Sequence, residues 1–413
     1  MKKIFTLLFA VIAGTSTTFA EIIEHIQIGE LYYNLDIENR TAEVTYQELW
    51  SDANYSGLTI VSIPESVKYN SVTYSVISIR DHAFNRCYHF TQVKLPNSLK
   101  KIGDSALGDC YALDTIFIPK NVEIIGAFAL IALNWAPNPI DDVSNLQAIV
   151  VDKDNLQFTS VDGVLYDKEV KTLIQYPTGK IGSFTIPTTV DSIATAAAYA
   201  SRISELTISE NVKKFGELAF MGCQVKTIHI LEGVTEIVSN VSSGGGVFSI
   251  CRKLEHVTLP NSLKKIGEQA FSNCPGIQEL TLGNDMEYIG SYAFTLDVAK
   301  CSITCLTKNI PIIEENSIHV VKHTTWNSEY NYMEYEEVEP SMLNVYVPAN
   351  KVEDYKADKH WGKYTILPIN TSTSLDEIDA YAIYGRSQKI LRNDQIYILR
   401  GDKTYTITGA EVK

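Results

Sequence analysis

The sequence predicts a β-rich solenoid of about ten coils, each of roughly 23 residues, because one motif recurs along most of the chain. The clearest copy runs from Leu254 to Cys274 and has the pattern Leu-x-x-Val-x-Leu-Pro-x-x-Leu-x-x-Ile-Gly-x-x-Ala-Phe-x-x-Cys. Further copies begin at Phe90, Leu113, Ile203 and Ile277. Stacked coils bury their apolar sides only against their neighbours, so they present a long surface instead of one cleft. This architecture favours binding over catalysis.

The first twenty residues predict an export signal. Lys2 and Lys3 form the charged start, residues 4–13 are apolar, and Thr18-Phe19-Ala20 suits a signal peptidase. No later apolar stretch is long enough to span a bilayer. We therefore expect a secreted or outer-surface protein that is not transmembrane.

Residues 21–57 precede the first repeat and are expected to cap the solenoid. Residues 31–37 and 41–46 alternate in polarity around Glu38-Asn39-Arg40, which predicts a β-hairpin. Such a hairpin would cover the first exposed strand edge.

Residues 58–370 are expected to form the solenoid itself. Alternate apolar residues predict a short strand that the proline ends, because proline cannot donate to a ladder. A second short extended segment ends at the recurring glycine, which we expect to allow the following turn. At about 4.8 Å per coil, ten coils predict a rod roughly 50 Å long.

Two insertions and a tail interrupt or follow this array. Residues 163–177 are expected to form an inserted hairpin, and residues 321–340 form an acidic, aromatic insertion. Residues 371–413 begin with the polar linker Thr371-Ser-Thr-Ser374 and continue as a small C-terminal β module.

The composition excludes some classes of partner. With 35 basic and 49 acidic residues the net charge is −14, which disfavours nucleic acid and anionic membranes. The chain has seven cysteines, which in an exported protein can indicate disulfides. Five of them share one repeat position, and we expect these to be buried free thiols: Cys87, Cys110, Cys223, Cys251 and Cys274.

The repeat motif resembles the BspA-like leucine-rich repeat family of bacterial surface proteins. Asp162-Gly-Val-Leu-Tyr166 with Leu173-Ile-Gln-Tyr-Pro177 is similar to that family's inserted hairpin. The leader from Tyr32 to Val44 and the tail from Ile396 to Gly409 resemble those of gut Bacteroidales members. The resemblance implies a β-rich leucine-rich-repeat solenoid, a role in adhesion to host matrix or other bacteria, and no shared catalytic residues.

A zinc site is one alternative to a purely structural role for two cysteines. Cys301, Cys305, His319 and His323 match the spacing of a two-Cys, two-His site. Against zinc, Cys301 and Cys305 lie in a coil strand register, and Pro311 interrupts the intervening segment. We expect no metal and no cofactor.

Two surfaces are candidates for ligand binding. The outward strand positions include Phe117 and His229 among threonines, which suit either an exposed strand or a ligand-contacting strip. The second insertion carries large aromatic residues, which are typical interface anchors but can also cover a coil surface: Trp326, Tyr330, Tyr332 and Tyr335.

These observations together predict a non-catalytic interaction protein of the cell surface. We expect adhesion to host matrix or other proteins through the solenoid. A polysaccharide-binding accessory protein is the alternative, because exposed aromatic rings stack on sugars. An enzyme is not indicated, since no nucleophile and base pair is evident in the sequence.

Overall fold

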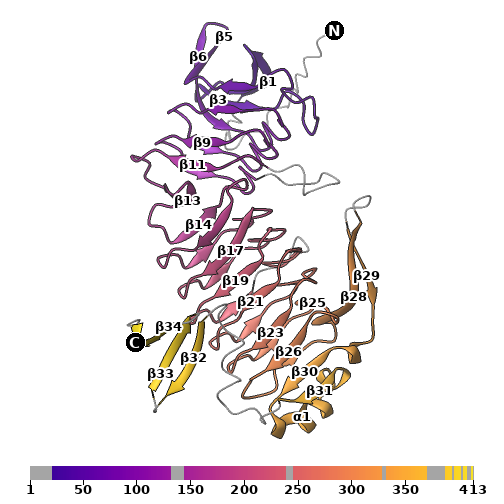
Figure 1. Ribbon diagram of the computed structural model, residues 1–413. Helices are drawn as coiled ribbons and strands as arrows, with labels where there is room; N and C mark the ends of the chain where they lie inside the picture. The colour runs from indigo at the N-terminus through magenta and orange to yellow at the C-terminus, as the bar shows by residue number, and fades with distance from the viewer. Residues whose placement is uncertain are drawn as a thin grey trace, which may run out of the picture.

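The computed structural model describes residues 21–131, 144–238, 245–327 and 332–369, together with four short strands between 387 and 412. The side chains of residues 323–326, 332, 333 and those four strands are outside this description. The chain is an elongated stack of coils whose strands lie side by side (Figure 1). The predicted export signal (residues 1–20) and the linker at 371–374 lie outside the described residues.

The first strand of each coil pairs in parallel with its counterpart in the next coil. The N-terminal strands form two pairs: β4 (Ile60–Ser62) with β7 (Gln92–Lys94), and β9 (Thr115–Ile118) with β11 (Ala148–Val151). The later strands form one eight-stranded sheet: β15 (Gly182–Thr185), β17 (Ile203–Ile208), β19 (Thr227–Ile230), β21 (His256–Thr258), β23 (Glu279–Leu282), β26 (Ser302–Cys305), β30 (Asn344–Val347) and β31 (Thr365–Pro368).

The inward positions of these strands form the predicted apolar column. Val93, Ile116, Leu206 and Leu280 are at most 4% exposed, and Val257 is partly buried against the same core. The alignment of the repeats is therefore confirmed, with Val257 as its least buried member.

A second, shorter strand in each coil extends the stack on another side. These strands form three groups, also parallel: β6 (Val72–Ile79), β8 (Lys101–Ile102) and β10 (Ile124–Ile125); β14 (Thr172–Gln175), β16 (Ser192–Ile193) and β18 (Lys214–Phe215); and β20 (Glu236–Ile237), β22 (Lys265–Ile266), β24 (Tyr288–Ile289) and β27 (Ile312–Ile313). Because each contributes only a few ladder bonds, the coils depend mainly on side-chain packing for stability.

Phenylalanines of the Ala-Phe pairs stack along the interior. The rings of Phe220, Phe248, Phe271 and Phe294 follow one another at centroid distances of 5.2, 5.1 and 5.3 Å and are nearly parallel. All seven cysteines are buried and free, as predicted for the five in the repeat position.

The recurring glycine has a different role from the one expected. It does not have a positive φ, so it is not required by the turn. A Cβ on Gly103 or Gly126 would lie 2.5 Å from a backbone nitrogen of the preceding coil, and one on Gly216 would lie closer still. The glycine is needed because adjacent coils approach each other there, and the interpretation as a turn residue is wrong.

The turns themselves contain positive-φ residues that are mostly not glycine. One such residue precedes the Ala of the Ala-Phe pair: His82, Ser105, Phe128, Ala196, Leu218, Gln269 and Tyr292. Another precedes the cysteine position: Arg86, Asp109, Ala200, Gly222, Ile250 and Asn273. Left-handed backbone costs a residue with a Cβ about 1 kcal/mol or more, so the stacking of coils must offset this strain.

The N-terminal cap is larger than a hairpin. β1 (Ile22–Ile28), β2 (Leu31–Asp36) and β3 (Thr41–Thr45) form an antiparallel meander, and β3 pairs in parallel with β6. A further hairpin, β5 (Ser66–Tyr69) with β6, lies within the first coil. β1 and β5 were not predicted from the sequence, because these edge strands lack a clear alternation of apolar and polar residues.

The first insertion divides the interior of the solenoid. β12 (Phe158–Val161), β13 (Val164–Asp167) and β14 are antiparallel neighbours, and β14 also pairs in parallel with β16. Leu165 packs in the N-terminal core, whereas Val164 and Tyr166 pack in the C-terminal core. The expected single solenoid therefore contains two hydrophobic cores that meet at β13.

Aromatic residues close the C-terminal end of the stack. Helix α1 (Val352–Ala357) lies between the short helices η2 (Ala349–Lys351) and η3 (Trp361–Lys363), after η1 (Pro340–Met342). Trp361 is fully buried, and its Nε1 donates to the carbonyl of Pro311 at 2.8 Å. The Tyr355 hydroxyl lies 2.9 Å from Thr307 Oγ1. The indole N–H of Trp361 and the hydroxyl of Tyr355 thus form hydrogen bonds with polar groups of the last coil, so α1 and η3 act as the C-terminal cap.

The remaining strands form two small sheets. β28 (Ile318–Asn327) pairs in parallel with β25 (Phe294–Asp297) and antiparallel with β29 (Tyr332–Glu337). The C-terminal residues form a four-stranded antiparallel sheet of β32 (Ser387–Arg392), β33 (Gln395–Arg400), β34 (Lys403–Thr406) and β35 (Glu411–Val412).

Candidate functional site

The outward side of the eight-stranded sheet, here called the front face, carries one column of mostly small polar side chains. The parallel register aligns Thr185, Thr207, His229, Thr258, Thr281, Thr304 and Tyr346. Their side chains are exposed or half-buried. Because β17 to β30 are each paired on both sides and β31 contacts the capping helix α1, most of this column lies on a firmly held sheet.

Charged groups lie beside this column. His229 Nε2 is 3.4 Å from Glu205 Oε1, and its Nδ1 is 3.4 Å from Thr258 Oγ1. His256 and Glu279 are paired across adjacent strands and are both exposed. The front face can therefore supply hydrogen bonds and charges of both signs to a partner.

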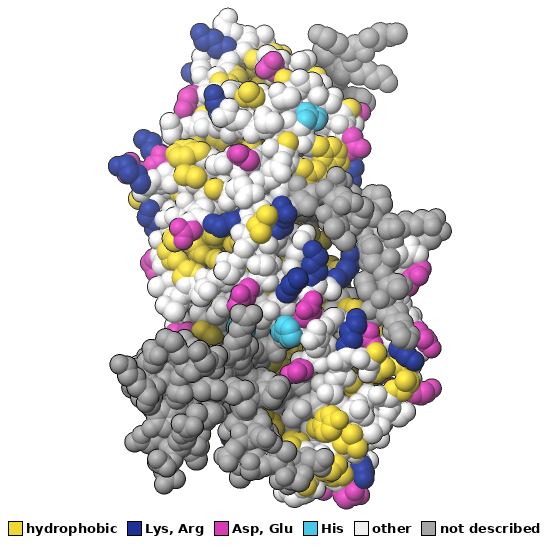
Figure 2. Space-filling view, viewed as in Figure 1, with side chains coloured by type: hydrophobic (Ala, Val, Ile, Leu, Met, Phe, Trp, Pro, Cys, Tyr) yellow, Lys and Arg dark blue, Asp and Glu magenta, His cyan; other side chains and the backbone are white. Residues whose placement is uncertain are grey.

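Phe117 does not belong to the same sheet as His229. It pairs in register with Val150, and these neighbours are 47% and 40% exposed. The strands β12 to β14 separate this pair from the eight-stranded sheet. Figure 2 shows apolar side chains gathered over the N-terminal coils and charges of both signs over the middle of the molecule. The predicted strip is therefore two separate surfaces, one apolar and one polar.

The second insertion is a β-hairpin that stands away from the coils (Figure 1). At its base the rings of Tyr335 and His319 are 5.1 Å apart, and His319 Nε2 lies 3.7 Å from Glu337 Oε1. Burial lowers the pKa of His319, and the nearby Glu337 only partly opposes this effect. Tyr335 of β29 thus packs against β28 within the hairpin, while the glutamates of β29 are exposed.

The other predicted aromatic anchors are only partly placed. Trp326 pairs with Met333, and Tyr332 pairs with Asn327, near the end of the hairpin. Their side chains and the whole of Tyr330 lie outside the described residues. Of the four aromatics, Tyr335 alone has a described side chain, and it contacts its own hairpin.

The possible zinc ligands are separated. Cys301 immediately precedes β26, and Cys305 is the last residue of that strand. Both are buried in the core, and burial raises the pKa of each thiol to about 12. His319 lies on β28 in another sheet, beside Tyr335. Among the described side chains, which exclude that of His323, no three His, Cys, Asp or Glu residues are grouped to hold a metal ion. Zinc binds thiolates, which this burial disfavours.

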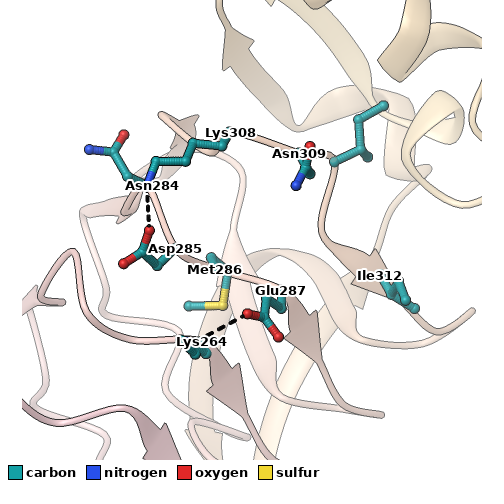
Figure 3. A pocket seen from close by; sticks show the side chains of 9 residues that line it. Lys264, Asn284, Asp285, Met286, Glu287, Lys308, Asn309 and Ile312 are labelled. Atoms are coloured by element: carbon teal, nitrogen blue, oxygen red, sulfur yellow. Dashed lines mark hydrogen bonds and ion pairs between the residues drawn. The ribbon is translucent and has the colours of Figure 1, made fainter.

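A shallow pocket of about 410 Å³ lies at the side of the C-terminal coils (Figure 3). Its charges are paired with one another: Lys308 Nζ lies 2.8 Å from Asp285, and Lys264 Nζ lies 3.6 Å from Glu287. Ile312 is 68% exposed at its rim. A pocket with neutralised charges and no nucleophile offers no basis for catalysis.

A third surface was not predicted from the sequence. Trp50 is 57% exposed, has a positive φ of 61°, and lies 4.4 Å from the His82 ring. Two residues further on, Asp52 accepts a hydrogen bond from the Tyr88 hydroxyl at 2.9 Å. The stacked Tyr88 and Tyr111 rings are 5.4 Å apart. The only sequence signal for this surface was a tryptophan in the segment before the first repeat, and its exposure could not be read from the repeat motif.

The stacked coils, the front face and the protruding hairpin define a leucine-rich-repeat solenoid that carries candidate binding surfaces. The BspA type leucine rich repeat region, in six copies, matches residues 65–134, 168–245 and 239–331, more than half of the chain. The protein therefore belongs to the BspA-like leucine-rich repeat family, a family of bacterial surface proteins with an interaction role. No described helix is long and apolar enough to cross a membrane.

Several solved structures resemble the chain at low identity. The pneumococcal vaccine antigen PcpA is 15% identical with a TM-score of 0.48, covering 86% of this chain and 100% of its own. A leucine-rich repeat protein of Bacteroides ovatus is 18% identical with a TM-score of 0.33, covering 84% and 100%. A leucine-rich cell surface protein of Faecalibacterium prausnitzii is 16% identical with a TM-score of 0.37, covering 68% and 88%. A search of curated proteins gave no match.

Proposed function

We propose that the protein is secreted or displayed on the cell surface, is not an enzyme, and adheres to host matrix or other proteins through its solenoid. The observation that carries this proposal is the front face, where seven of the eight parallel strands align one polar column. A rigid sheet loses little conformational entropy on binding, so such a surface suits recognition of another macromolecule. The family's surface role supports the same function.

The hairpin β28–β29 is the second part of the proposed contact surface. It protrudes from the coils and presents exposed Glu334, Glu336 and Glu337. Tyr335 and His319 hold its base.

A binding screen against matrix proteins and glycans tests the proposal. We expect a matrix or bacterial surface protein to bind, and deletion of residues 324–338 to weaken that binding at least tenfold, or about 1.4 kcal/mol. Trp326→Ala with Tyr332→Ala should reproduce most of the loss, because few aromatics usually dominate an interface. Glu38→Ala in the exposed cap turn is the control. The proposal fails if no protein binds at micromolar concentrations.

The front face is tested separately with bulky charged substitutions. Thr207→Arg and Thr258→Arg lie on the outward column and should leave the inward core unchanged. Loss of binding in these variants, with normal binding after the hairpin deletion, assigns the contact to the front face. Retention of binding in both sets excludes both surfaces.

Polysaccharide binding is the second candidate, and the patch around Trp50 favours it. The exposed indole of Trp50 offers a stacking surface, and Asp52, two residues further along the chain, offers a hydrogen-bond acceptor for sugar hydroxyls. Trp50→Ala should abolish any glycan binding found in the screen and leave protein binding unchanged. Glycan binding that is insensitive to Trp50→Ala would remove this assignment.

A further inference from the structure

β29 is an edge strand that is free in the described structure. The small sheet has the order β25–β28–β29, so β28 pairs with strands on both sides and β29 pairs on one side only. The hairpin stands away from the stacked coils (Figure 1). An unpaired strand edge presents backbone donors and acceptors that can accept another strand.

The register shows which backbone groups face this free edge. The carbonyl of Val321 accepts from Val298 N at 2.9 Å, so Val321 directs its backbone groups toward β25. The next residue, Lys322, therefore directs its groups toward β29, where it pairs with Glu336. By the alternation of a strand, Tyr335 and Glu337 direct their N–H and C=O groups to the free edge.

Two other edge strands of the described sheets, β31 and β1, are interrupted in the backbone, whereas β29 is protected by charge. β31 ends the eight-stranded sheet with Pro368, which has no N–H. β1 has a register shift between Ile23 and Ile26, where His25 has a φ of 57°. β29 has no proline in its six residues and instead exposes three glutamates within Glu334–Glu337.

Charge protects an edge selectively. Two β29 strands from separate copies would bring glutamates together, and like charges on facing strands oppose pairing. A strand rich in Lys or Arg would instead place opposite charges across the new ladder. The chain's net charge of −14 would also attract such a partner at long range.

We infer that the free edge of β29 binds an extended, Lys- or Arg-rich segment of a partner protein, which adds as a further strand to the sheet. Backbone hydrogen bonds to Tyr335 and Glu337 supply the pairing, and the glutamates supply the preference for basic sequences. This inference rests on the proposed interaction function and specifies one mode of it.

A pair of labelled peptides tests the inference by fluorescence anisotropy on the full mature chain. The first is acetyl-Lys-Thr-Lys-Val-Lys-Thr-Lys-amide. The second has prolines in place of Thr and Val, which keep the charge, remove three N–H groups and hold the backbone away from regular strand geometry. We expect at least tenfold tighter binding of the first peptide, weakening with salt. Equal binding of the two peptides would show that the contact is non-specific electrostatic attraction and would overturn the inference.

A matched pair of variants tests the backbone contact. Glu337→Pro removes an edge-facing N–H and one charge, whereas Glu337→Gln removes the charge alone. We expect at least a tenfold loss for the proline variant and less than a threefold loss for the glutamine variant. Equal affinities of the two variants would contradict strand addition. Self-association of the wild type that is abolished by Glu337→Pro would also contradict the inference, because a second copy of the chain would then occupy the edge.

Hydrogen exchange of the wild type gives a readout that does not depend on variant folding. The first peptide should slow exchange of the amides between Met333 and Glu337, and unchanged exchange there overturns the inference. Failure of the strand-addition inference is distinguishable from failure of the proposed function. A partner from the matrix screen that still binds after deletion of residues 324–338 would refute the edge site alone.

Discussion

The Sγ of Cys251 donates a hydrogen bond to the carbonyl oxygen of Phe220 in the preceding coil, 3.2 Å away. The same bond joins Cys110 to Phe84 at 3.3 Å and Cys274 to Phe248 at 3.2 Å. Burial raises the pKa of the Cys251 thiol well above its usual value of 9.0, which keeps the donor protonated. The cysteine of the repeat thus fills a small apolar space and satisfies one carbonyl at each step of the stack.

The buried thiols should resist alkylation in the native protein. Iodoacetamide reacts with thiolates, and burial both raises the thiol pKa and blocks access. We expect mass spectrometry to find no rapid labelling of the repeat cysteines until urea unfolds the chain: Cys87, Cys110, Cys223, Cys251 and Cys274. Fast native labelling of any of them would contradict the buried ladder.

Substitution of an inter-coil glycine should be more costly than its small size suggests. In Gly216→Ala the new Cβ would meet the backbone of Thr195, which cannot move away without separating two coils. We expect a loss of about 3 kcal/mol in urea unfolding.

Two other glycines are controls for Gly216→Ala. Gly222→Ala has space around it but a φ of +71°, so it should cost about 1 to 2 kcal/mol. Gly57→Ala meets no atom within 4 Å and should be nearly neutral. Equal effects of Gly216→Ala and Gly57→Ala would refute the close-approach explanation.

Carboxylate clamps between coils predict a pH dependence. Glu65 accepts from the amides of Asn97 and Ser98, both at 2.8 Å. These bonds, first that from Asn97, lower the pKa of Glu65 below its usual 4.5. Burial alone would raise the pKa of Glu232, but bonds from Asn261 and Ser262 outweigh it and lower the pKa.

A lowered carboxyl pKa stabilises the fold above the unfolded-state pKa, and the stabilisation is lost as the pH falls through the folded-state pKa. Glu65→Gln should therefore have a lower urea midpoint than wild type at neutral pH, and the difference should disappear near about pH 3. The effect should be modest because Glu65 is exposed and solvent screens it. A difference that grows on acidification would contradict the clamp. Glu123→Gln, at another exposed position, is the control.

A chelator tests whether the stability of the fold depends on bound zinc. Metal held by Cys301 and Cys305 would stabilise residues 301–323, so its removal would lower the melting temperature. We expect no change with EDTA, since both thiols are buried within the coils. A drop of several degrees would restore the zinc hypothesis.

The coil register could be predicted because stacking repeats the same physical constraint at each step. The inward positions Val93 and Leu280 and the shared cysteine position are recognisable in any single copy of the motif. The hairpin β28–β29 was recognisable as an insertion by its composition, but not as paired strands, because its bulged register departs from simple alternation. The surface around Trp50 was missed, since exposure of one aromatic residue in a cap depends on the packing of His82 and Tyr88.

The sequence by itself determined the solenoid class, the inward columns and the buried thiols, because a short period leaves each coil only its neighbours to pack against. Only the tertiary structure decided that two cores meet at β13, where Leu165 and Tyr166 point to opposite sides. It also decided that Gly216 serves close coil approach and that Phe117 and His229 lie on separate surfaces. These features depend on distances between coils, which a repeat pattern within each coil does not contain.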